Sequence, residues 1–161
     1  MKPRSSTIDA PGIRDLLSYR LHVVANLLSR GAELRYRREF GVSLWEWRTV
    51  ALLGGAAGAQ SLNELSRAAG IDKSQMSRVV SGLAARRLVL RSIDAEDGRG
   101  VKLTLTRAGR SLYEGLIRAA AGRNDAFLDC LSMKERAAFD EALAKLAARA
   151  KQFIEREGAG R

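Results

Sequence analysis

The sequence predicts a mainly helical protein that carries one small β-hairpin. Apolar residues recur at spacings of three and four over most of the 161 residues, which is the periodicity of helices with one buried face. The periodicity changes to two only between residues 88 and 105, where apolar and polar residues alternate around a turn that contains glycine. Capping motifs, in which a serine or aspartate precedes a glutamate or glutamine by three residues, mark where several helices begin.

The first helix is predicted over residues 11–39. Pro11 suits its first turn, and Gly41 is a plausible stop. One face of this helix is apolar, with residues spaced by four, three and four positions: Leu17, Leu21, Val24 and Leu28. Residues 1–10 lack such a pattern and are predicted to form a flexible arm.

Four capping motifs begin later helices. They pair Ser43 with Glu46, Ser61 with Glu64, Asp72 with Gln75, and Ser132 with Glu135. The helices that follow from them are predicted over residues 43–54, 61–69, 72–87 and 132–156. Another helix is predicted over residues 106–129, directly after the hairpin.

The last helix carries an apolar stripe with heptad-like spacing, formed by Phe139, Leu143, Leu146, Ala150 and Phe153. Such a stripe either packs within one chain or meets a second chain. Because apolar helices stand at both ends of a small domain, the sequence favours a homodimer in which the N- and C-terminal helices interleave.

The helices at 61–69 and 72–87 have the lengths and the short connection of a helix-turn-helix. A charged hairpin follows them at once, so together they predict a winged helix, a shape suited to double-stranded DNA. The net charge of +10 agrees with a polyanionic partner. Residues 61–109 carry nine basic against five acidic side chains, and residues 1–41 carry eight against four.

The helix that begins at Asp72 is the predicted recognition helix. Its inward face is apolar, with Met76, Val79, Val80 and Leu83. The predicted DNA contacts on its other face are Lys73, Ser74, Gln75, Ser77 and Arg78. Gln75 could pair with adenine and Arg78 with guanine, while Lys73 and Ser74 suit phosphate. Gln75 is also needed by the cap, and a plain solvated helix would show the same pattern.

In the hairpin, Arg99 lies between two glycines and is predicted to enter the minor groove. Asp97 would hold the loop or orient Arg99 through a charge-assisted bond. Arg91 and Lys102 are predicted to contact the DNA backbone. The alternative for this segment is an ordinary surface turn rich in aspartate and glycine.

The hairpin from Asp97 to Gly109 resembles the D-x-R-x-x-x-L-x-L-T-x-x-G signature of MarR-type regulators. Residues 71–83 resemble their recognition helix, and Leu44–Arg48 their second helix. The resemblance covers residues 13–155. It implies a single domain over residues 11–161, with a winged-helix lobe at 43–109 and dimerisation helices at 11–40 and 110–156. It also implies a homodimer that represses transcription from pseudo-palindromic operators and releases DNA when a small, often aromatic, acid binds.

Such dimers hold the ligand between the dimerisation helices and the lobe. The candidate lining residues in this chain are Arg20, His22, Trp45, Trp47 and Arg48. Arginine or histidine beside tryptophan would suit an aromatic carboxylate. Two of them also have an ordinary explanation: Trp47 as a core residue and His22 as a satisfied helix residue.

The remaining features of the sequence mainly argue against particular functions. One cysteine and one histidine make a zinc site improbable, and no cofactor is predicted. Cys130 is expected to be a small packing residue and not a redox sensor. No membrane span or secretion signal is seen, so a cytoplasmic protein is expected. An enzyme is disfavoured, since no nucleophile–base pair or phosphate loop is present. The main alternative is an architectural protein that binds DNA without sequence preference.

Overall fold

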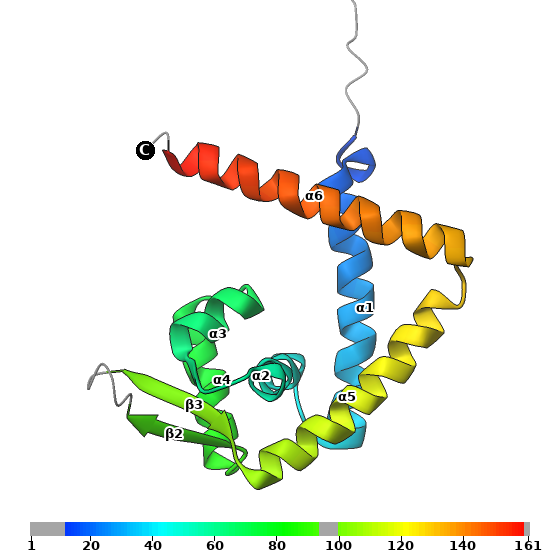
Figure 1. Ribbon diagram of the computed structural model, residues 1–161. Helices are drawn as coiled ribbons and strands as arrows, with labels where there is room; N and C mark the ends of the chain where they lie inside the picture. The colour runs from blue at the N-terminus through cyan, green and yellow to red at the C-terminus, as the bar shows by residue number, and fades with distance from the viewer. Residues whose placement is uncertain (1–11, 94–99, 160–161) are drawn as a thin grey trace, which may run out of the picture. The chain divides into compact units, whose positions relative to one another are not determined.

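The computed structural model describes residues 12–93 and 100–159. A 3₁₀ turn at Ile13–Asp15 precedes these elements: α1 (Leu17–Phe40), α2 (Leu44–Gly55), β1 (Gln60–Ser61), α3 (Leu62–Ala69), α4 (Lys73–Ala85), β2 (Val89–Ile93), β3 (Val101–Leu105), α5 (Arg107–Leu128) and α6 (Met133–Ala159) (Figure 1). The chain divides into two compact units, and the boundary in the sequence falls within α5, between Leu116 and Ile117. The prediction of a mainly helical protein with a small β-wing is confirmed.

The sheet has three antiparallel strands in the order β1-β3-β2. Strands β2 and β3 form the predicted hairpin, with Val89 opposite Leu105 and Ile93 opposite Val101. Strand β1, which was not predicted, is only two residues long and pairs Ser61 with Lys102. A strand this short has no periodicity of its own, so only its pairing with β3 reveals it.

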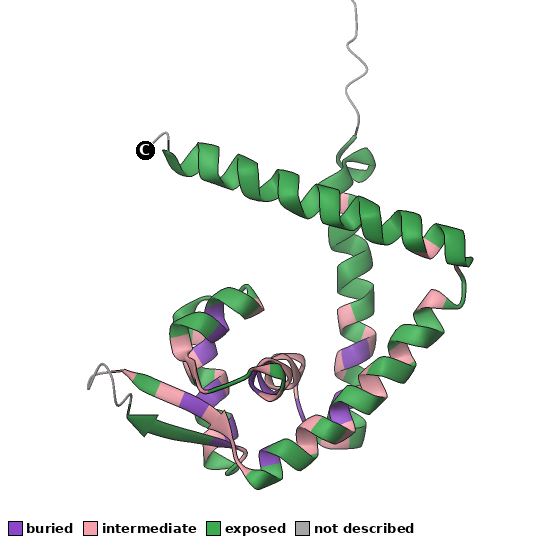
Figure 2. Ribbon diagram, in the orientation of Figure 1, coloured by how far each residue is buried: buried purple, intermediate pink, exposed green. Residues whose placement is uncertain are grey.

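The core of the first unit lies where α2, α3 and α4 meet β3 (Figure 2). Its fully buried side chains include Val50, Leu65, Met76, Val80, Leu83, Leu103 and Leu116. Three of the four apolar positions predicted to face inward on α4 are buried, and the fourth, Val79, is half-buried. The helix therefore presents one fixed face to the core and the opposite face to solvent.

Three of the four predicted capping motifs form in full. In α2 and α3, the serine hydroxyl accepts the amide of a glutamate three residues on, and that glutamate accepts the serine amide in return. Ser132 and Glu135 bond in the same reciprocal way at α6. The bonds from the backbone and then the side chain of Ser61 hold the pKa of Glu64 below its ordinary value.

The junction between α4, β2 and α5 depends on Thr106. Its hydroxyl donates to the Arg87 carbonyl at 2.7 Å and accepts the Gly109 amide at 3.0 Å. Its own amide donates to the Leu88 carbonyl at 3.1 Å. Arg87 is the only non-glycine among the described residues with a positive φ, at 56°. One side chain thus joins a tight turn after α4 to the first turn of α5.

Two expectations need correction. The helix predicted from residue 11 begins as α1 only at Leu17, because the extended Leu16 separates it from the 3₁₀ turn. Cys130 is exposed instead of packed. It lies in the turn after α5, where its thiol donates to the Phe127 carbonyl at 3.2 Å.

The apolar stripes of the first and last helices are exposed in the single chain. On α1, Leu17 and Val24 are 51% and 54% exposed, and only Ala32 and Tyr36 are buried. On α6, no residue is buried, and Phe139 and Phe153 are 47% and 52% exposed. Figure 2 shows this exposure along each helix. Within the part of the chain that the structure describes, no helix has the length and hydropathy required to cross a membrane.

Candidate nucleic-acid interface

Two backbone features form the turn between α3 and α4. Gly70 ends α3 with a φ of 68°, a left-handed conformation that favours glycine. The Ile71 amide donates back to the Ser66 carbonyl at 3.1 Å, which closes the turn. Asp72 then begins α4 by accepting the Gln75 amide at 2.8 Å. The two helices therefore meet in the short, fixed turn of a helix-turn-helix.

Contacts from α2 hold α4 near its start and at its end. The buried Thr49 hydroxyl donates to the Trp45 carbonyl and lies 3.5 Å from the Met76 sulfur. Glu46 uses one carboxylate oxygen for its cap and the other to accept from Arg86 at 3.0 Å. The recognition helix is thus locked on its inner side before it meets any ligand.

The outer face of α4 carries the predicted DNA contacts. Lys73, Ser74 and Arg78 are exposed, and Gln75 and Ser77 are half-buried. The cap at Asp72 uses only the backbone of Gln75, so among the described residues no hydrogen bond occupies the Gln75 side chain. Gln75 therefore does not have to choose between capping α4 and contacting a base. Its side-chain amide can face a base edge.

The predicted DNA-contacting residues of the hairpin differ in their surroundings. Arg91 points toward α4, where its guanidinium donates to the Ser81 hydroxyl at 2.8 Å. Lys102 is half-buried, and its charge helps to lower the pKa of Glu64 after the larger effect of the Ser61 bonds. Arg99 and Asp97 lie outside the described residues, so their predicted roles stay predictions.

Sequence reasoning overlooked Ser81 as a site residue. Its hydroxyl accepts from Arg91 and donates to the Ser77 carbonyl at 2.8 Å, one turn earlier on α4. The only signal for it in the sequence was its place on the polar face of the helix. Its partner could not be identified without the packing of β2 against α4.

The basic run at the end of α1 is largely paired within its own helix. Arg35 and Arg38 bond Glu39 at 2.9 and 3.2 Å, and Arg37 bonds Glu33 at 2.5 Å. These carboxylates reduce the charge that the run offers to phosphate. The recognition helix, whose exposed basic residues have no such partners among the described residues, is the stronger candidate for a DNA-binding surface.

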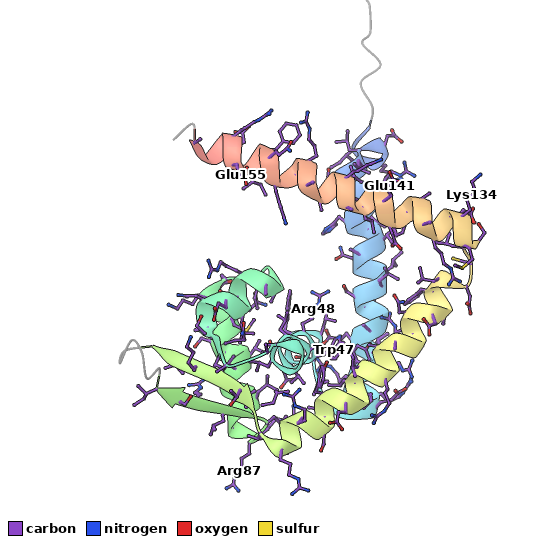
Figure 3. All side chains as sticks on the ribbon, in the orientation of Figure 1. Trp47, Arg48, Arg87, Lys134, Glu141 and Glu155 are labelled. Carbon is purple, nitrogen blue, oxygen red and sulfur yellow. The ribbon has the colours of Figure 1, made fainter. Side chains whose placement is uncertain are left out.

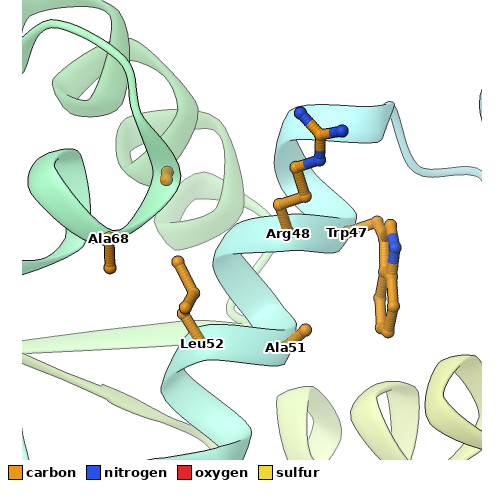
Figure 4. A pocket seen from close by; sticks show the side chains of 6 residues that line it. Trp47, Arg48, Ala51, Leu52 and Ala68 are labelled. Atoms are coloured by element: carbon orange, nitrogen blue, oxygen red, sulfur yellow. The ribbon is translucent and has the colours of Figure 1, made fainter. Parts of the chain in front are cut away.

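A pocket of 360 Å³ lies in the first unit between α2 and α3, away from the outer face of α4. Its lining is formed by Trp47, Arg48, Ala51, Leu52, Ala68 and Ala69 (Figure 4). Two of the five predicted ligand-contacting residues, Trp47 and Arg48, therefore line one pocket. The volume is within the usual range for small-molecule sites.

Arg48 is held in place at this pocket. Its guanidinium donates to the Ser29 hydroxyl of α1 at 3.1 Å and lies 4.9 Å from the centre of the Trp45 ring. Trp47 packs against Tyr36, with the ring centres 5.3 Å apart. Figure 3 labels the two consecutive residues Trp47 and Arg48 on α2. Trp45 thus supports the site indirectly.

Besides Trp45, two further predicted ligand-contacting residues do not line this pocket. Arg20 and His22 are exposed on the first two turns of α1, and His22 lies 2.8 Å from the side chain of Asn26. No group of three or more residues that could hold a metal ion occurs within residues 12–93 and 100–159.

Comparison with known proteins places these features in a family. A sequence model of the MarR family matches residues 40–100. No curated protein sequence matches the chain. A MarR/EmrR family transcriptional regulator from Acinetobacter is 27% identical, with a TM-score of 0.77 over 84% of this chain and 94% of its own. A MarR family transcriptional regulator from Silicibacter pomeroyi is also 27% identical, with a TM-score of 0.76 over 87% and 98%.

A more distant structure shares the fold at 20% identity. This is MepR from Staphylococcus aureus in complex with DNA, with a TM-score of 0.76 over 84% of this chain and 98% of its own. The matched segment contains α2, the helix-turn-helix and β2, the parts in which the polar face of α4 and the first three caps were found. Residues 40–100 thus match the MarR family, and the chain shares its fold with solved MarR family transcriptional regulators.

Proposed function

We propose that the chain is a homodimeric repressor that binds pseudo-palindromic operators and releases them when a small aromatic acid binds. The observation that carries this proposal is the locked recognition helix: its inner face is buried, and Lys73, Gln75 and Arg78 point away from the core. A helix fixed in this way can present its polar face to the major groove without losing much conformational entropy.

The exposed apolar stripes of α1 and α6 support the homodimer. Leu17, Val24 and Phe153 each leave half or more of their surface in water, although each sits in a regular apolar repeat. A second copy that covers these stripes would remove that apolar surface from solvent. Two recognition helices would then lie about 10 base pairs apart, which matches a palindromic operator.

The pocket beside Arg48 supports the ligand. An arginine that offers its remaining N–H groups, next to a tryptophan ring, binds a carboxylate and an aromatic ring together. The small side chains of Ala51, Ala68 and Ala69 leave space for that ring. Because α3 lines the same pocket and begins the helix-turn-helix, a ligand there would act on the element that supports α4.

Sequence-specific binding is the first prediction. Fluorescence anisotropy on duplex DNA from the gene's own upstream region, with a scrambled duplex as competitor, is expected to show selective binding that weakens steeply with salt. Arg78→Ala should reduce discrimination by about tenfold, the loss expected for one base contact. Lys73→Ala is the matched control: it should weaken both duplexes equally and lower the salt slope by about one. Equal affinity for both duplexes would favour the architectural alternative.

Release by an aromatic acid is the second prediction. In the same assay, one member of a panel of aromatic acids is expected to weaken operator binding by the wild-type chain. Arg48→Ala should abolish this response while leaving operator affinity without the acid unchanged, because Arg48 lies away from the outer face of α4. His22→Ala, which removes a side chain outside the pocket, should retain the response. Loss of the response in His22→Ala alone would place the ligand elsewhere.

A further inference from the structure

We propose that Arg91 is a positioning residue, which holds the wing strands β2 and β3 against the recognition helix through Ser81. This proposal rests on the proposed DNA-binding function and deepens it. It assigns Arg91 a role inside the protein in place of the phosphate contact that the sequence suggests. The difference can be measured, because the two roles predict different responses to salt and to the loss of Ser81.

The Ser81 hydroxyl takes part in two hydrogen bonds at once. The Arg91 guanidinium donates to the Ser81 hydroxyl oxygen at 2.8 Å, and that hydroxyl donates its own proton to the Ser77 carbonyl at 2.8 Å. The hydroxyl therefore cannot rotate without losing one of its partners. A charged donor makes such a bond stronger than one between neutral groups.

The strand register explains why Arg91 faces the helix. Arg91 pairs with Leu103, and cross-strand partners point to the same face of a sheet. Leu103 is 1% exposed, so this is the face covered by the helices. The neighbours Leu90 and Ser92 must point to the other face because side chains alternate along a strand. Arg91 is exposed, but its place on this face of the sheet directs it toward α4.

A cavity lies beside this bond. It measures 190 Å³ and is lined from the helices by Leu62, Ser77 and Val80, and from the sheet by Arg91, Val101 and Leu103. Packing between the sheet and α4 is therefore incomplete at this point, and the Arg91–Ser81 bond lies at its edge. Loss of the bond would let the wing change its angle to the helix at little packing cost.

The angle matters because both elements must meet DNA at the same time. The recognition helix is suited to the major groove, and the hairpin tip to the backbone or the adjacent minor groove. If the angle varies, binding must first fix it, and that ordering lowers the affinity. Ser81 also lies one turn after Ser77, so the bond connects the wing directly to the face of α4 that reads bases.

The test compares Arg91→Ala, Ser81→Ala and the double variant in the anisotropy assay at several salt concentrations. Each single variant is expected to lower operator affinity by about threefold to tenfold, the effect of one charge-assisted bond at a partly exposed site. The double variant should lose no more than either single one, since both remove the same bond. The slope of affinity against salt should stay that of the wild type in all three.

The matched control is Ser111→Ala, which removes an exposed serine hydroxyl from α5 and should leave the affinity unchanged. The proposal is overturned if Ser81→Ala binds like the wild type, or if Arg91→Ala lowers the salt slope by about one, the mark of a lost phosphate contact. It is also overturned if the two effects add. Failure of the wild-type chain to prefer the operator would instead refute the proposed function, so the two failures can be told apart.

Discussion

Alanine at Gly109 is expected to destabilise the chain by about 2 kcal/mol or more, the cost of forcing extra volume into a packed site. A Cβ atom at this position would lie 2.0 Å from the Leu88 carbonyl oxygen and 3.3 Å from a methyl group of Leu105. The first contact is with backbone, which a rotamer change cannot relieve. The Leu88 carbonyl is also the acceptor of the Thr106 amide, so any shift breaks the junction that joins α4, β2 and α5.

Gly122→Ala provides the matched control. Gly122 lies in the same helix, α5, but a Cβ atom there would meet nothing within 4 Å. Alanine in an open helical position is expected to stabilise by about 0.5–1 kcal/mol. Urea denaturation at one fixed protein concentration should therefore move the two midpoints in opposite directions. A Gly109→Ala variant as stable as the wild type would show that this junction is not packed as the structure has it.

The contrast between these two glycines shows which structural features can be predicted from the sequence and which cannot. Gly109 belongs to the L-T-x-x-G part of the signature, so the sequence marks it but gives no reason for it. The reason depends on Leu88, which is distant in sequence and reaches the first turn of α5 only through the hairpin. The helix caps were predictable because the two residues of each cap are only three positions apart. The caps at Ser43, Ser61 and Asp72 all form.

The candidate site likewise has some features that the sequence predicts and others that it does not. The polar face of α4 follows from helical periodicity alone, so Lys73 and Arg78 were predicted on it and are exposed. The bond between Arg91 and Ser81 depends on where a strand packs against a helix, which periodicity does not encode. The resemblance suggested Trp47 and Arg48 as ligand contacts; both line the pocket between α2 and α3, and their contact with a ligand stays a prediction. The alanines of this pocket were not predicted, because a space left by small side chains has no signal of its own.

Glutamate at Leu143 is expected to convert the proposed dimer into a monomer and to lower operator affinity by about a hundredfold or more. Leu143 lies in the middle of the α6 stripe and is 38% exposed in the single chain. A carboxylate buried there against a second copy would lack a compensating charge, which costs several kcal/mol. The affinity falls because the second recognition helix then binds from free solution and no longer at the high effective concentration that a linked partner provides.

Ala148→Glu is the matched control for this substitution. It adds the same charge to the same helix, five residues on, at a position that helical periodicity places opposite the apolar stripe. Sedimentation equilibrium should find Leu143→Glu at the monomer mass of 17.6 kDa and Ala148→Glu at twice that mass. Far-ultraviolet circular dichroism should show that both remain helical. A Leu143→Glu dimer that binds the operator normally would mean that α6 is not the surface through which two chains meet, and that the exposed stripe of α1 must carry the association instead.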